Sequence, residues 1–298
     1  ANGVEVIGGL LVGFKYVGDV MNRLEREGRI GELLLACEES HGFVGGNYIR
    51  EKDAVVPAIW LSELSATLKK KGETLLDYLE EIYSQYGYFR NYLTEIRLPG
   101  AEGMSQIKKI QDGLRKGKPK KFGRFIVQSV EDWLDRKPIV SETDRVSKNG
   151  LVFRFRPIKG TTSMRVTVRP SGTEPKIKMY FEIGSEPFDP KDMVKVRGLM
   201  ELILQDLERE FMMTCYRIIG VNFPKRGFLL FWQLPLTDKL HYFQIEHKIA
   251  GLRKIGKREE RRKQLTEMLR FLGSDPIKKV DNAFKQRYKK GIEAHLNL

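Results

Sequence analysis

The sequence predicts an α/β protein in three parts: a partial mixed-sheet α/β domain, a small α+β domain and a mostly helical, basic tail. Residues 33–37 form an uninterrupted apolar run, typical of a strand buried on both faces of a sheet. Residues 164–181 alternate apolar and polar side chains on both sides of a short loop, which indicates two half-buried strands. After residue 215, basic residues and helical periodicity dominate. We therefore place the domains at residues 1–137, 138–215 and 216–298.

Within the first part, we expect a short strand at residues 4–7, a helix at 19–27 and the buried strand at 33–37. Asp53 is a good N-cap for a helix that reaches about residue 71. Thr74 has the same role for a helix to residue 86, which carries an apolar stripe. The basic stretch 115–121 is broken by glycine and proline and indicates a solvated loop.

In the second part, we expect strands at residues 151–157, 162–169 and 176–183, followed by an amphipathic helix at 190–212. The tail favours helices at 239–254, 257–272 and 276–295. Asp275 precedes Pro276, a combination that predicts an N-cap followed by proline at the first helical position. The aromatic run 228–232 gives the tail a surface that can pack on the rest of the chain.

Composition narrows the class of protein. The 298 residues carry a net charge of +14, and residues 216–298 hold 19 Lys and Arg against 8 Asp and Glu. We interpret this excess as solvated helical faces and expect no nucleic-acid partner, because the tail has no recognised nucleic-acid motif. The apolar runs are all too short to span a membrane, and the first residues do not fit a signal peptide. Two cysteines form no disulfide framework, so we expect a cytoplasmic protein.

The loop between the two alternating strands is the strongest candidate site. Arg169 and Lys178 fall on the polar face, and the loop adds Gly172 and the hydroxyls of Ser171 and Thr173. Cations, hydroxyls and a glycine turn are what a phosphate monoester requires. The alternative is a structural β-turn with incidental cations. Glu174 would repel phosphate if it pointed inward, so we expect it to point outward or to pair with a cation.

A second cluster follows the strand at residues 33–37. Glu38, Glu39, Ser40 and His41 lie at its carboxyl end, where ligands bind in open α/β sheets. Arg50 and Lys52 precede the helix expected after Asp53, and cations beside a helix N-terminus favour a bound anion.

Three stretches together resemble one family. Residues 169–175, Arg-Pro-Ser-Gly-Thr-Glu-Pro, resemble the phosphate-binding loop in the last domain of the α-D-phosphohexomutases, the phosphoglucomutases and phosphomannomutases. Residues 37–42 and 49–53 resemble the sugar-binding loop of the third domain of that family, and residues 13–16 a further loop of that domain. The resemblance covers residues 1–215 and implies a TATA-binding-protein-like fold for the last mutase domain.

The resemblance also implies a reaction and site roles. The family interconverts hexose 1-phosphate and hexose 6-phosphate with Mg²⁺ and a phosphoserine. The resemblance assigns the non-reacting phosphate to Arg169, Ser171, Gly172, Thr173 and Lys178. It assigns sugar contact to Glu38, Ser40 and Lys15, and it places Arg50, Lys52 and His41 near the transfer centre. Other interpretations stay open for these residues. Glu38 and Ser40 cap the loop that follows them, or Glu39 is the sugar contact instead. His41 forms its hydrogen bonds with the backbone, or Lys52 pairs with Glu51.

Two family loops have no match in this sequence. We find neither a Ser-His-Asn-Pro loop, which carries the transferred phosphoryl group, nor an Asp-x-Asp-x-Asp-Arg loop, which holds Mg²⁺. We therefore assign no catalytic residue and no metal ligand, and we expect the C-terminal portion of a mutase that binds hexose phosphate. Whether a partner chain supplies the missing domains stays open. The alternative is a noncatalytic sugar-phosphate-binding protein or an inactive gene fragment.

Overall fold

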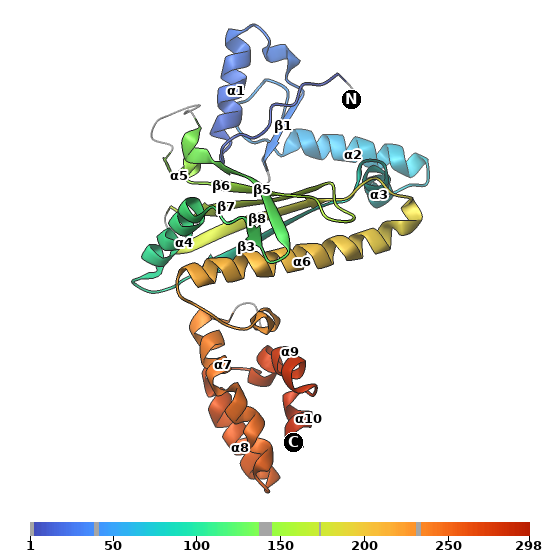
Figure 1. The fold of residues 1–298 in the computed structure, drawn as a ribbon. Coiled ribbons are helices and arrows are strands. Elements are labelled where there is room, and N and C mark those ends of the chain that lie inside the picture. Colours follow the sequence, from blue (N-terminus) through green and yellow to red (C-terminus); the bar gives the residue numbers. More distant parts are fainter. Residues whose placement is uncertain (1–2, 39–41, 137–144, 173, 231–233) are drawn as a thin grey trace. The chain divides into compact units, whose positions relative to one another are not determined.

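A computed structural model describes residues 3–38, 42–136, 145–172, 174–230 and 234–298. The chain divides into two compact units, residues 1–206 and 207–298. Figure 1 traces both units in sequence colours. The mixed α/β fold with a helical C-terminal region, predicted from the sequence, is confirmed.

The first part of the first unit holds three helices and a two-stranded sheet. In order these are α1 (Lys15–Arg26), β1 (Leu35–Glu38), β2 (Gly42–Gly45), α2 (Val55–Lys70) and α3 (Leu75–Tyr86). β1 and β2 pair antiparallel. Phe14, Val17 and Met21 pack with Val44 of β2 in a small hydrophobic core. At the start of α3, Thr74 and Asp77 form the reciprocal bonds of a capping box.

A six-stranded antiparallel sheet forms the rest of this unit, in the order β3-β8-β7-β6-β5-β4. Its strands are β3 (Phe89–Arg97), β4 (Lys121–Phe122), β5 (Phe125–Asp132), β6 (Leu151–Phe155), β7 (Ser163–Pro170) and β8 (Lys176–Gly184). The helices beside it are α4 (Gly103–Gly117), α5 (Arg145–Lys148) and α6 (Met193–Ile218), of which α4 contacts β7 and β8. Figure 1 shows the part of α6 that belongs to this unit, residues 193–206, running along one face of the sheet.

The sheet has one apolar and one polar face because β7 and β8 alternate strictly. Val166 and Val168 of β7, and Met179 and Phe181 of β8, are fully buried. The intervening residues of both strands are only partly buried, Arg169 among them. The period-two pattern in the sequence therefore placed the candidate cations on the correct face.

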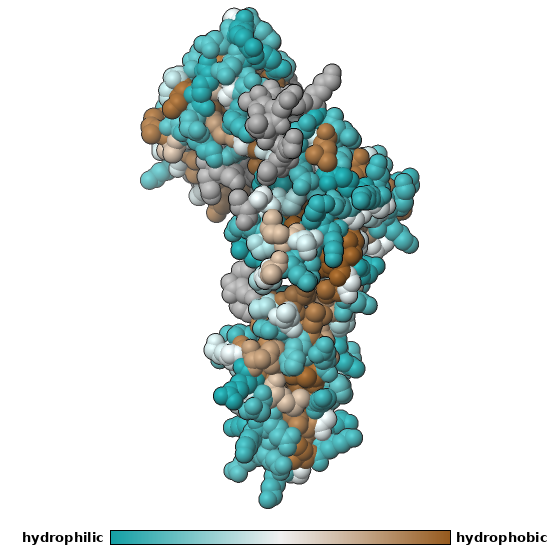
Figure 2. Space-filling model, turned by 90° about the vertical axis from the view of Figure 1, so that its left-hand side faces the viewer, coloured by the Kyte–Doolittle hydropathy of each residue, from teal (hydrophilic) through white to brown (hydrophobic). Residues whose placement is uncertain are grey.

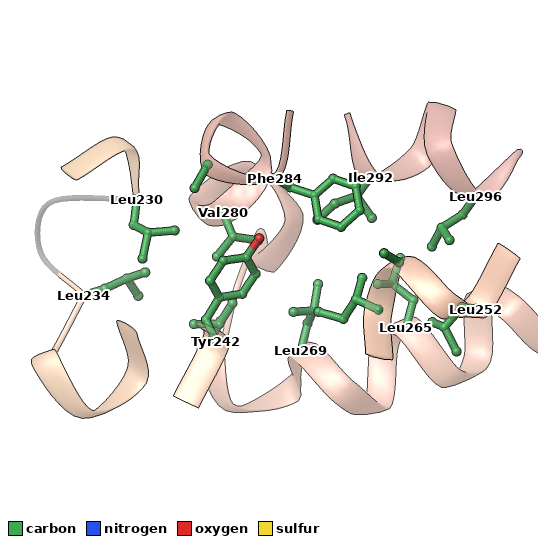
Figure 3. Packing of buried hydrophobic residues seen from close by; sticks show 14 residues of the cluster. Leu230, Leu234, Tyr242, Leu252, Leu265, Leu269, Val280, Phe284, Ile292 and Leu296 are labelled. Carbon is green, nitrogen blue, oxygen red and sulfur yellow. The ribbon is translucent and has the colours of Figure 1, made fainter. Parts of the chain in front are cut away.

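Residues 207–298 include a bundle with its own core. It contains α7 (Leu236–Gly251), α8 (Arg258–Leu269), α9 (Pro276–Tyr288) and α10 (Ile292–Leu296). Figure 3 shows Tyr242 and Leu269 from α7 and α8 facing Val280 and Phe284 of α9. Short 3₁₀ turns complete the chain at Ile30–Glu32, Trp133–Asp135, Pro190–Asp192, Lys225–Leu229, Leu252–Lys254 and Arg270–Leu272.

Five local predictions were wrong. The stretch 115–121 is not one solvated loop, because residues 115–117 end α4, Lys121 begins β4, and the 19% exposed Arg115 side chain pairs with Asp132. The helix expected at 276–295 is divided into α9 and α10. Residues 4–7 form no strand, and Val6 is 86% exposed. The run at 33–37 is not buried on both faces, because β1 pairs only with β2 and Leu35 is exposed. Asp275 precedes α9 with a left-handed backbone, φ 48°, and its side chain makes no capping hydrogen bond.

The predicted domain boundaries at 137/138 and 215/216 remain predictions. Strands from both sides of the first boundary share the six-stranded sheet, since β3, β4 and β5 precede it and β6, β7 and β8 follow it. The helices expected after Asp53 and Thr74 are found as α2 and α3. The sequence interpretation had proposed no element for β3, α4 or β5.

Candidate functional site

The loop between β7 and β8 joins two cations that lie side by side. Arg169 and Lys178 are direct cross-strand partners, and Pro170 pairs with Ile177 where the strands end. The Ser171 amide donates to the Lys176 carbonyl (2.9 Å), which closes the loop at its base. The Glu174 amide donates to the Ser171 hydroxyl (3.3 Å). Gly172 is exposed at the tip.

Arg169 has an unusual environment among these residues. Its Nε is buried and has no hydrogen-bond partner in the part of the chain that the structure describes. A buried donor without a partner is costly, and one on a charged group more so, unless a ligand or water satisfies it. The guanidinium therefore has donor capacity available beside the loop.

Two further cations surround the loop. Arg97 of β3 is the cross-strand partner of Lys176 on β8. Glu174 forms an ion pair with Lys176, as expected if it does not point at an anion. The hydrogen bond that the Lys176 ammonium donates to the Glu174 carboxylate lowers the pKa of this exposed carboxyl. The charges of Lys176, Arg97 and Lys178 lower it further. Lys176 is paired with Glu174 and Arg97 with Glu95, so among the described residues the unpaired positive charge at the loop comes from Arg169 and Lys178.

The start of α4 packs against the loop at Pro175. The Leu98 amide donates to the Pro175 carbonyl (3.0 Å). A Cβ added at Gly103, the first residue of α4, would lie 1.8 Å from the Leu98 carbonyl oxygen and 2.9 Å from Pro175 Cβ. Only glycine fits this close backbone approach. The loop's position therefore depends on a residue far from it in the sequence.

A second pair forms at the end of β1. Lys52 and Glu38 make an ion pair, in which the Glu38 side chain is 16% exposed and that of Lys52 38%. The Lys52 ammonium also lies 5.9 Å from the centre of the Phe14 ring. Glu51 does not take the Lys52 side chain: it accepts from the Lys52 backbone amide instead (2.9 Å). Glu38, predicted to contact the sugar, and Lys52, predicted near the transfer centre, are thus brought together.

The other predicted residues lie in different surroundings. The Arg50 guanidinium donates to Asn22 (2.9 Å) and Glu25 (2.7 Å), so it is held against α1. The Lys15 ammonium lies 5.2 Å from the centre of the Tyr16 ring. Four residues named from the sequence, Glu39, Ser40, His41 and Thr173, lie outside the described residues.

Sequence reasoning missed Arg97 and the supporting role of Gly103. Arg97 is brought to the loop by pairing between β3 and β8, which are distant in sequence. The sequence offered little signal for this strand, because Leu93 interrupts the polar positions Asn91, Glu95 and Arg97. Gly103 has no local signature, because its neighbours come from tertiary packing.

Metal-binding clusters and membrane-spanning helices are both absent from the residues that the structure describes. Within those residues, no group of three or more His, Cys, Asp or Glu side chains is placed to hold a metal ion. No chemical step is assigned to a metal ion. Among the described helices, none combines the length and apolarity that crossing a membrane needs.

Comparison with known proteins gives two consecutive domain matches. Residues 1–86 match phosphoglucomutase/phosphomannomutase alpha/beta/alpha domain III, and residues 95–187 match the C-terminal domain of the same family. A phosphoglucomutase of Staphylococcus aureus strain MRSA252 is 32% identical over 186 residues, which is 60% of this chain and 32% of that protein. The phosphoglucomutases of strains MSSA476 and USA300 are 32% identical over 184 residues, with the same coverage.

The fold and the two matched domains thus define a phosphohexomutase-type protein. The chain belongs to the phosphoglucomutase/phosphomannomutase family. It spans about a third of the length of the curated relatives that it matches.

Proposed function

We propose that this chain supplies the phosphate- and sugar-binding part of a phosphohexomutase that interconverts hexose 1-phosphate and hexose 6-phosphate. In the proposal, Arg169, Ser171, Gly172, Thr173 and Lys178 hold the phosphate that is not being transferred. The observation that carries it is the buried, unpartnered Nε of Arg169 beside Lys178. A phosphate at the loop would be paired with two cations at once, and it would accept from the buried Nε after a shift of the Arg169 side chain.

The sugar side of the proposal rests on Glu38 and its partner. A carboxylate accepts hydrogen bonds from two neighbouring sugar hydroxyls, and the ion pair with Lys52 fixes its orientation. We assign Ser40 and Lys15 to further sugar contacts, and Arg50, Lys52 and His41 to the neighbourhood of the transfer centre. For Arg50 this requires release from Asn22 and Glu25, or a role in positioning the loop through α1.

The two clusters have separate roles in the proposed reaction. Exchange of phosphate between two ends of one sugar requires that one end be held while the other reacts. The cationic loop holds a phosphate, and the Glu38 pair orients the hydroxyls. The proposal assigns neither Mg²⁺ nor the phosphoryl-carrying serine to any residue of this chain, and it expects residues 1–298 alone to show no mutase turnover. A cytoplasmic location is part of the same proposal.

A noncatalytic sugar-phosphate-binding protein is the second candidate. It uses the same loop and the same Glu38 pair, so it shares every binding prediction. Turnover distinguishes the two once the chain is combined with a protein that supplies the remaining mutase domains. Activity that appears only in the mixture favours the mutase. Binding without activity in any mixture favours the second candidate.

Calorimetry of Arg169→Ala tests the phosphate site. Losing charge-assisted contacts should cost about 1.5–3 kcal/mol of binding free energy, which is about a 10- to 150-fold rise in Kd for glucose 6-phosphate. Arg154→Ala removes an exposed cation outside the loop (51% exposed) and serves as the matched control. Equal affinity for wild type and Arg169→Ala would contradict the assignment, and loss in both variants would indicate unspecific charge attraction.

A further inference from the structure

The six-stranded sheet ends at an open edge formed by β3. β3 pairs with β8 over all of its nine residues without a bulge, and no second strand pairs with it among the described residues. A long, regular edge of this kind is a template for another strand. Figure 2 shows a different unpaired surface, hydrophobic and in brown, running along the helical unit between hydrophilic flanks. The β3 edge differs from that surface, because its charge pattern selects a partner.

The hydrogen bonds between β3 and β8 show which residues face the open edge. The Ser185 amide donates to the Tyr88 carbonyl, and the Leu98 amide donates to the Pro175 carbonyl, each at 3.0 Å. Hydrogen bonding to one neighbour alternates along an antiparallel strand, so the even-numbered residues of β3 face β8. The amides and carbonyls that point to the open edge are therefore those of residues 89, 91, 93, 95 and 97.

Both faces of the sheet leave this edge accessible. On the polar face, Leu93 is 48% exposed. On the face that the helices cover, Tyr92 is 38% exposed, so the helices leave part of its ring open. The Arg90 guanidinium reaches the edge, where it donates to the Asn91 carbonyl (2.7 Å), and it also donates to Glu201 of α6 (3.1 Å). The Asn91 carbonyl keeps a second lone pair for a strand partner.

The sequence of β3 is self-complementary in one antiparallel register. When Leu93 lies opposite Leu93 of a second copy, every residue of Phe89–Arg97 has a counterpart. Asn91 then faces Glu95, so its side-chain amide can donate to the carboxylate. Phe89 faces Arg97, whose guanidinium can lie over the ring. In this register, no two charges of the same sign in β3 lie directly opposite each other.

Neighbouring registers are less favourable. Centring the pair on Glu95 sets two carboxylates directly opposite each other, which is destabilising. Centring it on Asn91 leaves Glu95 and Arg97 beyond the end of the partner strand. A shift of one residue in either direction sets the exposed Leu93 against Asn91 or Glu95, so its apolar contact is lost.

We propose that β3 pairs antiparallel with β3 of a second copy of this chain, centred on Leu93, so that two six-stranded sheets become one continuous sheet. Main-chain hydrogen bonds supply the attraction, and the side chains of residues 89–97 set the register. Both copies use the same surface, so the contact closes as a two-fold dimer.

Sedimentation of the full chain over a range of concentrations tests this contact, and we expect a reversible equilibrium between monomer and dimer. Leu93→Glu sets two carboxylates opposite each other and should raise the dissociation constant about tenfold. Ile126→Glu changes a similarly exposed residue (47%) on β5 of the same sheet and should leave the constant unchanged. A wild-type chain that stays monomeric at every concentration, or a dimer that Leu93→Glu leaves unchanged, overturns the proposal.

Oxidative cross-linking tests the register without relying on the fold of Leu93→Glu. Opposite residues of a hydrogen-bonded pair have Cα atoms about 5.5 Å apart, which suits a disulfide. Leu93→Cys should therefore give a disulfide-linked dimer in a Cys37→Ser background, which removes the exposed native thiol; Cys215 is buried. Glu95→Cys in the same background should not, because the two copies of residue 95 lie about 14 Å apart along the strands. Equal yields from the two variants, or linkage of Glu95→Cys alone, overturns the pairing.

Discussion

Replacing Glu246 with glutamine removes a negative charge from inside the helical unit. The Glu246 side chain is fully buried, and its carboxylate forms ion pairs with Arg226 and Arg287, the latter at 2.8 Å. The Tyr242 hydroxyl donates to the same carboxylate (3.2 Å). Arg226 is itself 14% exposed in its side chain. Glutamine has the same shape but leaves Arg226 without a counter-charge.

The size of the effect follows from burial. Removing one partner of a buried pair costs about 3–5 kcal/mol, because the remaining charge stays desolvated. We expect the lower end, about 3 kcal/mol, since the glutamine oxygen still accepts one hydrogen bond. With a urea dependence of about 1–3 kcal/mol/M, the unfolding midpoint of this unit should fall by about 1–3 M.

The unfolding midpoint of this unit can be measured separately from that of the first unit. Hydrogen exchange of the full chain is followed at increasing urea concentration by mass spectrometry on peptides from α7 and α9. Arg270→Gln is the matched control, because its pair with Glu267 is 80% and 73% exposed in the two side chains. That variant should cost less than about 1 kcal/mol. A loss below about 1 kcal/mol for Glu246→Gln would refute the reasoning, since it would mean that the pair is solvated.

Two further predictions concern the first unit. Gly103→Ala should displace the loop at Pro175 and weaken glucose 6-phosphate binding, because its Cβ would meet the Leu98 carbonyl; Gly117→Ala, with open space around it, should not change affinity. Asp53 accepts hydrogen bonds from Tyr48 and from the first amides of α2, which lower its pKa, so its contribution to stability is present above the unfolded pKa and is lost as pH falls through the folded value. In Asp53→Asn, the free energy of unfolding should therefore fall less than in wild type as the pH is lowered from neutral to acid. Urea unfolding at each pH measures this, and an unchanged pH dependence would contradict that role.

Much of the site could be predicted from the sequence because its signals are local. Arg169 and Lys178 lie on the polar face of alternating strands, and alternation alone fixes that face. Thr74 and Asp77 form their capping box within one turn of helix. Glu38 and Lys52 were named separately from loop patterns, and the fold brings them together.

The remaining features depend on contacts between distant residues. Arg97 lies beside the loop only because β3 pairs with β8. The apolar run at 33–37 was interpreted from composition, but burial on two faces requires neighbours on both sides, and β1 has β2 on one side. Asp275 fits a capping pattern, yet its backbone is left-handed instead of extended, and its side chain makes no capping hydrogen bond to α9.

The most direct test of the central claim is hydrogen exchange of the full chain with and without glucose 6-phosphate. If Arg169 and Lys178 hold the phosphate and Glu38 contacts the sugar, protection should increase in peptides that cover residues 169–178 and 35–52. Peptides from the helical unit, residues 241–271, should not change. Unchanged exchange at 169–178 with saturating ligand, or protection confined to the helical unit, would contradict the account.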